Sequence, residues 1–348
     1  MTDVFKVFTA LTTIFGSCGA VFNLLICILY LKNPQLLDAP NIFILVSSAG
    51  DFLQSIMTTP LLVLSNARGE WLFGEAGCTI YAFITAFFGL SSMMHFAGIA
   101  YERYSTFCRF LDGNNETQFG KKRAIVLSIL LWCYSFFWSL MPIIGWSNYA
   151  LEGIGTSCAI NWRSHEATHV SFTFCLMLAC YVLPVTIMVS SYYKTYKMYC
   201  QYSLQNNLNN TNLHAIREAL EKERKMTWVT VALASGFLLA WTPYVISTIV
   251  AILKPNVMTE LAASIPAYIA KSSFCYNPII YASVDKKMRR KLADTFCCKS
   301  NQINPLPISG SAGSLKAGQS NSVSKRQFPH FPLDKSNEDS EDELAVRD

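Results

Sequence analysis

Charged residues are scarce in this 348-residue chain. Asp, Glu, Lys and Arg make up 15% of it, whereas soluble proteins carry roughly a quarter. The shortage is concentrated in long apolar stretches, and 52% of all residues are hydrophobic. This pattern excludes an ordinary soluble protein of this length and indicates a chain whose main solvent is the bilayer.

Metal-ligand motifs and internal repeats are also lacking. Twelve cysteines are present, yet none forms a CxxC pair with metal-ligand spacing, so we expect no metal site. Many cysteines lie in apolar stretches, where they behave as small buried hydrophobes: Cys18, Cys27, Cys133, Cys175, Cys180 and Cys275. The net charge of +5 comes from short basic segments between apolar runs, so nucleic acid is not needed as a partner.

Seven stretches are long and apolar enough to cross a bilayer, for which a helix needs about 20 residues. They cover about 7–31, 41–64, 78–105, 122–145, 169–196, 225–253 and 261–284. The first has no small-residue cleavage site, so we interpret it as a retained helix and not as a signal peptide. The sequence therefore predicts an all-α membrane protein built as a seven-helix transmembrane bundle.

Lysine and arginine are unevenly distributed over the connecting segments. One set of connections holds Lys32, Arg103, Arg109, Lys121, Lys122, Arg123, Lys194, Lys197, Arg217, Lys222, Arg224, Lys225 and Lys286 to Lys291. The other set holds only Lys6, Arg68, Arg163 and Lys254. Because cytoplasmic loops carry the basic excess, we expect a short extracellular N-terminus (1–6) and a cytosolic C-terminus.

The residues after the last span predict a membrane-surface helix and a tail. Residues 285–296 are basic and place apolar side chains on one face, as in a short cytosolic amphipathic eighth helix. Cys297 and Cys298 close it and form a candidate palmitoylation site. Residues 299–348 are rich in Ser, Asn, Pro, Gly and charge, which predicts a disordered tail after the 7–298 domain. The polar stretch 201–212 likewise predicts a mobile cytosolic loop.

Lys271 lies in the middle of the seventh apolar stretch, where it cannot easily reach either membrane surface. An ionisable residue at that depth indicates a functional site. Burial favours the neutral amine, which is the form that condenses with an aldehyde to give a Schiff base. The alternative is a lysine that pairs with a polar partner in the wall of a cavity.

Several motifs around this lysine resemble those of animal opsins, which are rhodopsin-like G protein-coupled receptors. Lys271 stands in AKSSFCYNPIIY, six residues before the NPxxY motif of Asn277, Pro278 and Tyr281. Glu102, Arg103 and Tyr104 form an ERY triplet, and Trp241, Pro243 and Tyr244 belong to AWTPY. The resemblance covers about 22–298, and the mid-membrane lysine makes it specific for opsins. It implies retinal bound covalently to Lys271 through a protonated Schiff base.

The resemblance also implies the surroundings of this linkage. The third-helix position that carries the counterion in vertebrate visual pigments is Tyr81, which has no charge, so Glu152 in the second extracellular loop is the expected counterion. Cys78 and Cys158 correspond to the family disulfide. Tyr81, Gly89, Trp241 and Tyr244 resemble retinal-contacting positions.

Two further implications concern the polar residues inside the spans and the cytosolic end. Asp51 and Asn23 are expected to pair with Asn277 directly or through water, because buried polar groups need partners. Arg103 beside Glu102 is expected to form the ionic contact of the resting state.

Two functions from different classes are compatible with these residues. The first is a light-sensing receptor that activates a heterotrimeric G protein and is then a target for a receptor kinase and arrestin. The second is a photoisomerase that binds all-trans-retinal and releases the 11-cis form, because MPIIGW, TSCAINW and FFGLSSM resemble the non-visual peropsin and retinochrome-like branch. A receptor for a diffusible ligand is the third alternative. The retinal isomer bound in the dark and the G protein subtype stay open.

Overall fold

The computed structural model describes residues 3–111, 120–208, 213–254, 257–284 and 286–296. The first four long helices are α1 (Asp3–Lys32), α2 (Ala39–Arg68), α3 (Gly74–Leu111) and α4 (Lys121–Leu140). A short 3₁₀ turn at Pro34–Leu36 connects α1 to α2. Helix α1 begins at Asp3, within the segment 1–6 that was predicted to precede it. The end of the bundle domain at 298 and the tail 299–348 lie outside the described residues.

The second half of the bundle contains interrupted helices. Helix α5 (Ala167–Met177) passes through a π-helical turn at Leu178–Val182 into α6 (Leu183–Leu208), and α7 runs from Leu213 to Leu253. The prediction of a mobile loop at 201–212 was wrong for 201–208, which continue α6, whereas 209–212 lie outside the described residues. Helix extensions that continue beyond the bilayer are not apolar, so a search for hydrophobic runs does not find them.

The seventh apolar stretch is divided into three elements. Helix α8 (Glu260–Lys271) ends at the candidate lysine, a 3₁₀ turn covers Ser272–Cys275, and α9 covers Tyr276–Val284. Among the described residues, six helical segments are individually long and apolar enough to cross a membrane. The seventh crossing is made by α8, the 3₁₀ turn and α9 together, which explains why it is missing from that set.

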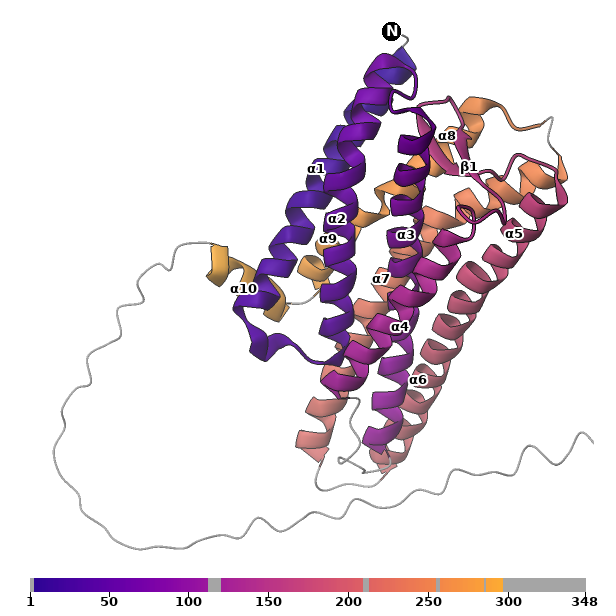
Figure 1. The fold of residues 1–348 in the computed structure, drawn as a ribbon. Coiled ribbons are helices and arrows are strands. Elements are labelled where there is room, and N and C mark those ends of the chain that lie inside the picture. Colours follow the sequence, from indigo (N-terminus) through magenta and orange to yellow (C-terminus); the bar gives the residue numbers. More distant parts are fainter. Residues whose placement is uncertain (1–2, 112–119, 209–212, 255–256, 285, 297–348) are drawn as a thin grey trace, which may run out of the picture.

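Helix α3 lies at the centre of the bundle, where it contacts α2, α4, α6 and α7 (Figure 1). The main apolar core joins these helices and α1 through fully buried side chains such as Leu29, Phe43, Ala100 and Leu233. Many other apolar side chains point outward, as expected where lipid and not water is the surrounding solvent. The all-α seven-helix prediction is confirmed for the architecture of the bundle.

A small β-hairpin, which was not predicted from the sequence, lies at the end of the bundle that carries the N-terminus (Figure 1). Strands β1 (Tyr149–Glu152) and β2 (Ser157–Ile160) pair antiparallel, with Glu152 opposite Ser157. Helix α10 (Lys286–Phe296) lies toward the other end, where Met288 is buried and contacts the main core. The hairpin is therefore the element that reaches the candidate lysine from outside the bundle.

Candidate functional site

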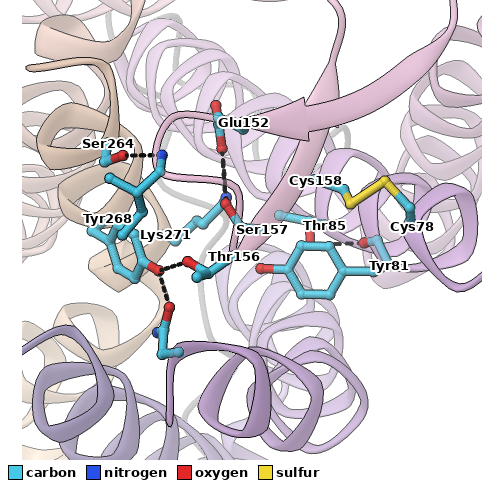
Figure 2. A network of polar contacts seen from close by, with 12 residues as sticks. Cys78, Tyr81, Thr85, Glu152, Thr156, Ser157, Cys158, Ser264, Tyr268 and Lys271 are labelled. Carbon is cyan, nitrogen blue, oxygen red and sulfur yellow. Dashed lines mark hydrogen bonds and ion pairs between the residues drawn. A yellow bond between two sulfur atoms is a disulfide. The ribbon is translucent and has the colours of Figure 1, made fainter. Parts of the chain in front are cut away.

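The amine of Lys271 forms an ion pair with Glu152. Lys271 Nζ donates a hydrogen bond to Glu152 Oε2 at 2.7 Å and a second one to Ser157 Oγ at 3.2 Å (Figure 2). The side chain of Glu152 is 2% exposed and that of Lys271 is 13% exposed. The structure thus brings together the lysine and the carboxylate that the resemblance paired.

The hairpin holds Glu152 against α8 through its turn. Gly153 has φ +56°, and a Cβ at this position would overlap the hydroxyl of Ser264. The same hydroxyl accepts a hydrogen bond from Ile154 N at 3.0 Å. Because only glycine permits this approach without strain, the turn fixes the carboxylate at the end of β1. Ser157, opposite in the register, donates to Glu152 Oε2 at 3.4 Å.

A disulfide fastens the hairpin to α3. Cys78 Sγ and Cys158 Sγ are 2.07 Å apart, so the predicted pairing of these two cysteines is confirmed. Tyr149, in β1, donates to the carbonyl of Ser139 at 2.7 Å. Burial raises the pKa of the Tyr149 phenol, which therefore remains a donor over the physiological pH range.

Two tyrosines complete the surroundings of the amine. The ring centroid of the buried Tyr81 lies 5.7 Å from Lys271 Nζ, a distance suited to a cation–π contact. Tyr268, three residues before Lys271, donates to Asn66 Oδ1 at 2.6 Å and shares a hydrogen bond with Thr156 Oγ1 at 3.2 Å (Figure 2). Tyr268 and Ser157 were not predicted as site residues from the sequence. The i, i+3 spacing to Lys271 was the available signal for Tyr268.

Apolar space extends from Lys271 into the bundle. A cavity of about 110 Å³ is lined by Lys271, Thr85 and Ala86, and a neighbouring one of about 100 Å³ by Gly89 and Cys180. Five residues line both cavities: Leu90, Ile160, Leu176, Trp241 and Tyr244. A primary amine at the end of narrow apolar space fits a long, flat, apolar aldehyde such as retinal.

Trp241 closes one side of this space. A Cβ on Gly89 would lie 3.0 Å from the indole ring, so the glycine lets α3 approach the tryptophan closely. The indole Nε1 donates to Ser273 Oγ at 3.0 Å, and its ring stacks on Phe237 with centroids 5.5 Å apart. Trp241 therefore connects α7 to the 3₁₀ turn that follows Lys271.

The NPxxY region binds the polar centre of the bundle. Asn277 Nδ2 donates to Asp51 Oδ2 at 2.9 Å, and Ser92 Oγ donates to Asp51 Oδ1 at 2.9 Å. Asn23 does not contact Asn277 directly, because its Nδ2 donates to the carbonyls of Gly19 and Phe274, and a pairing through water stays a prediction. Pro278 belongs to α9, and the Tyr281 side chain is buried in the main core.

The ERY triplet forms a compact ion pair. Arg103 Nε lies 2.6 Å from Glu102 Oε2, and Arg103 Nη2 lies 2.8 Å from Glu102 Oε1. Both residues are buried, and Thr106 Oγ1 also donates to Glu102 at 2.8 Å. The ring of Tyr104 lies 5.6 Å from Lys194 Nζ.

The predicted lipidation site at Cys297 and Cys298 lies outside the described residues. No group of three or more His, Cys, Asp or Glu side chains in the described part is arranged to hold a metal ion.

Comparisons with known proteins agree with this geometry. The sequence model of the family described as "7 transmembrane receptor (rhodopsin family)" matches residues 22–281. Melanopsin-A of Gadus morhua is 30% identical over 82% of this chain, which spans about half (52%) of that protein. The visual pigment-like receptor peropsin of Homo sapiens is 30% identical over 87% of this chain and 89% of its own length. The crystal structure of squid rhodopsin superposes with a TM-score of 0.79 and 27% identity, covering 86% of this chain and 89% of that one.

Proposed function

We propose a function for this chain from its family. The chain belongs to the rhodopsin family of seven-transmembrane receptors and, within it, to the animal opsins. The protein is a light receptor in which Lys271 holds retinal as a protonated Schiff base with Glu152 as counterion. It signals to a heterotrimeric G protein. The main support for this proposal is the 2.7 Å contact between Lys271 Nζ and Glu152 Oε2 at the end of the apolar cavity.

Each side chain of the site has a defined task in this proposal. Retinal, when bound, supplies light absorption and a light-driven change of shape. Glu152 neutralises the positive nitrogen on Lys271, and Ser157 orients the carboxylate by hydrogen bonding. Gly89, Trp241 and Tyr244 shape the walls and exclude water, and the ring of Tyr81 faces the nitrogen of Lys271.

The signal passes through residues that join the cavity to the opposite end of the bundle. Trp241 contacts the cavity and is hydrogen-bonded to Ser273, in the turn that leads to Asn277. A ligand shifts a two-state bundle only through contacts that differ between the states. We assign such contacts to Trp241 and the resting-state ion pair to Glu102 and Arg103.

The direct experiment is reconstitution with each retinal isomer in the dark. We expect a visible absorption band and light-dependent nucleotide exchange on an added G protein. The same preparation of Lys271→Ala should give neither. A band that persists in Lys271→Ala, together with an acid-trapped retinal adduct on another residue, would contradict the proposal.

A retinal photoisomerase is the second candidate function. The similarity to peropsin over most of both chains favours it, as do the peropsin-like and retinochrome-like stretches around the hairpin and in α3. This function predicts a dark preference for all-trans-retinal and the release of 11-cis-retinal on illumination. Chromatography of the extracted retinal separates the two functions when nucleotide exchange is measured in the same sample.

The remaining assignments follow from the sequence and the family. We propose that the N-terminus is extracellular and the C-terminus cytosolic, because the basic connections lie on the C-terminal side. Cys297 and Cys298 are assigned to palmitoylation, which would anchor the chain end in the membrane lipid. Serines of the tail, including Ser320, Ser322, Ser324, Ser336 and Ser340, are assigned to a receptor kinase and arrestin binding.

A further inference from the structure

A second, much larger cavity lies between α1, α2 and α8. Its volume is about 610 Å³, whereas the two cavities beyond Lys271 measure about 110 and 100 Å³. Sites for small ligands occupy about 300–1,000 Å³. This space alone is therefore large enough for one complete ligand molecule.

The cavity extends from the lipid-facing surface to the interior. Val7 and Ile265 form part of its outer rim and are 55% and 47% exposed. Leu62 and Tyr81, on the inner wall, are 5% and 1% exposed. Because the rim residues belong to membrane-crossing segments, a ligand would enter from the bilayer and must itself be lipophilic.

An aromatic pair forms one wall. Phe8, on α1, stacks on Tyr268, on α8, with ring centroids 4.2 Å apart and an interplanar angle of 30°. The hydroxyl of Tyr268 is fixed by its hydrogen bond to Asn66, so the ring has a defined orientation. A fixed flat surface of this kind favours a flat conjugated ligand.

The lining is mostly apolar, but it also contains polar side chains such as Thr58, Thr59 and Thr85. Gln54 lines the cavity and is 5% exposed. Within the described ranges its side-chain amide has no hydrogen-bond partner. An amide that lines a cavity is available to a ligand, and a ligand with one terminal oxygen would accept its hydrogen bond.

Lys271 and Thr85 line both this cavity and the narrow one that leads to Trp241. We propose that the large cavity binds a second, non-covalent retinoid, with its apolar body against Phe8 and Tyr268 and its terminal oxygen on the Gln54 amide. The choice of a retinoid rests on the proposed function, whereas the site itself rests on the cavity and the unpaired amide. Such a site would store a retinoid beside the lysine that binds retinal.

The test is a titration with tritiated all-trans-retinol, which has no aldehyde and cannot react with Lys271. The protein is placed in lipid nanodiscs, with and without prior addition of retinal, and binding is corrected by empty nanodiscs. We expect one saturable site in both preparations. Gln54→Leu should weaken binding about fivefold, the loss that corresponds to one hydrogen bond between neutral groups. Ile265→Trp, which fills the cavity from its rim, should abolish the saturable component.

Ile246→Trp is the matched control. Ile246 is also lipid-exposed and lines a groove of about 550 Å³ between α7 and α8, so this change should leave retinol binding intact. Binding equal to that of empty nanodiscs, or equal loss in Ile246→Trp and Ile265→Trp, would overturn the second site. If retinal gives no visible band but retinol binds saturably and responds to the variants as expected, the proposed function fails and the second site stands. If retinal gives a visible band but retinol binding does not saturate, the second site fails and the proposed function stands.

Discussion

Lys271 Nζ and Glu152 Oε2 lie 2.7 Å apart although 119 residues separate them in the chain. One belongs to α8 in the bundle and the other to the end of β1 in the hairpin. Two opposite charges in a low-dielectric interior each remove much of the cost of burying the other. The position of the hairpin and the charge on the lysine are therefore linked.

We expect Lys271→Ala to abolish the visible band, because alanine supplies no amine. The change also leaves Glu152 as a buried carboxylate without its cation, which should cost about 3–5 kcal/mol of stability. Lys271→Ala combined with Glu152→Gln should restore expression but not the band. Lys254→Ala changes an exposed lysine and is the control, which should keep both normal expression and the visible band. Absorption spectra and surface expression measure the two effects.

Glu152→Gln should move the loss of the long-wavelength band to lower pH. A negative carboxylate favours the protonated linkage on Lys271, so a neutral amide lets the proton leave at lower pH. At a pH where the wild type is coloured, the variant should absorb in the ultraviolet. Spectra recorded across pH in the dark and after illumination measure this shift. Glu166→Gln, at a side chain that is 78% exposed, should behave like the wild type. Identical titrations of Glu152→Gln and wild type would exclude Glu152 as the counterion.

Removing the disulfide should impair folding. Cys78→Ala or Cys158→Ala frees the hairpin from α3, and loss of a native disulfide typically costs about 2–5 kcal/mol. The expected result is reduced surface expression and a lower temperature of irreversible inactivation. Cys133→Ala removes a free, exposed cysteine of α4 and serves as the control. Equal thermal inactivation of Cys78→Ala and Cys133→Ala would contradict this prediction.

Glu102→Gln should raise G protein activation in the dark. The change removes the charge that holds Arg103 Nε and Nη2, so the arginine can more easily adopt a different orientation. Thr106→Ala removes only one hydrogen bond to Glu102 and should give a smaller increase. Nucleotide exchange without illumination measures both. Unchanged dark activity in Glu102→Gln would show that this pair does not restrain the resting state.

The bundle could be predicted from the sequence because each crossing needs a long apolar run, and the runs are unambiguous. Lys271 could be singled out because a charge at that depth is costly. The partnership with Glu152 came from resemblance alone. The loop between α4 and α5 mixes apolar and polar residues with glycines. Its local pattern gives no signal for β1 and β2, whose pairing depends on contacts with α3 and α8.

Polar partners inside the bundle were harder to predict than the spans. A direct contact between Asn23 and Asn277 is absent among the described residues. The carbonyl of Phe274 lies in the 3₁₀ turn, where the hydrogen-bond pattern of the helix is interrupted, and it accepts the hydrogen bond of Asn23 instead. Tyr268 and Asn66 are 202 residues apart, so no local pattern reveals their contact. Such pairings depend on how the helices are rotated against each other, and apolar periodicity specifies this rotation only coarsely.

The 3₁₀ turn at Ser272–Cys275 gives the seventh crossing a flexible joint directly after Lys271. Its hydrogen bonds have poorer geometry than those of an α-helix, so opening this turn costs less free energy than opening α8. Helices α8 and α9 can therefore twist relative to each other. Torque produced at Lys271 can be taken up in the turn, so that α9 does not have to move together with α8. We expect the amide hydrogens of 273–276 to exchange with deuterium faster than those of 264–271, and to change their exchange rate most on illumination. Uniform exchange along the crossing would mean that it rotates as one body.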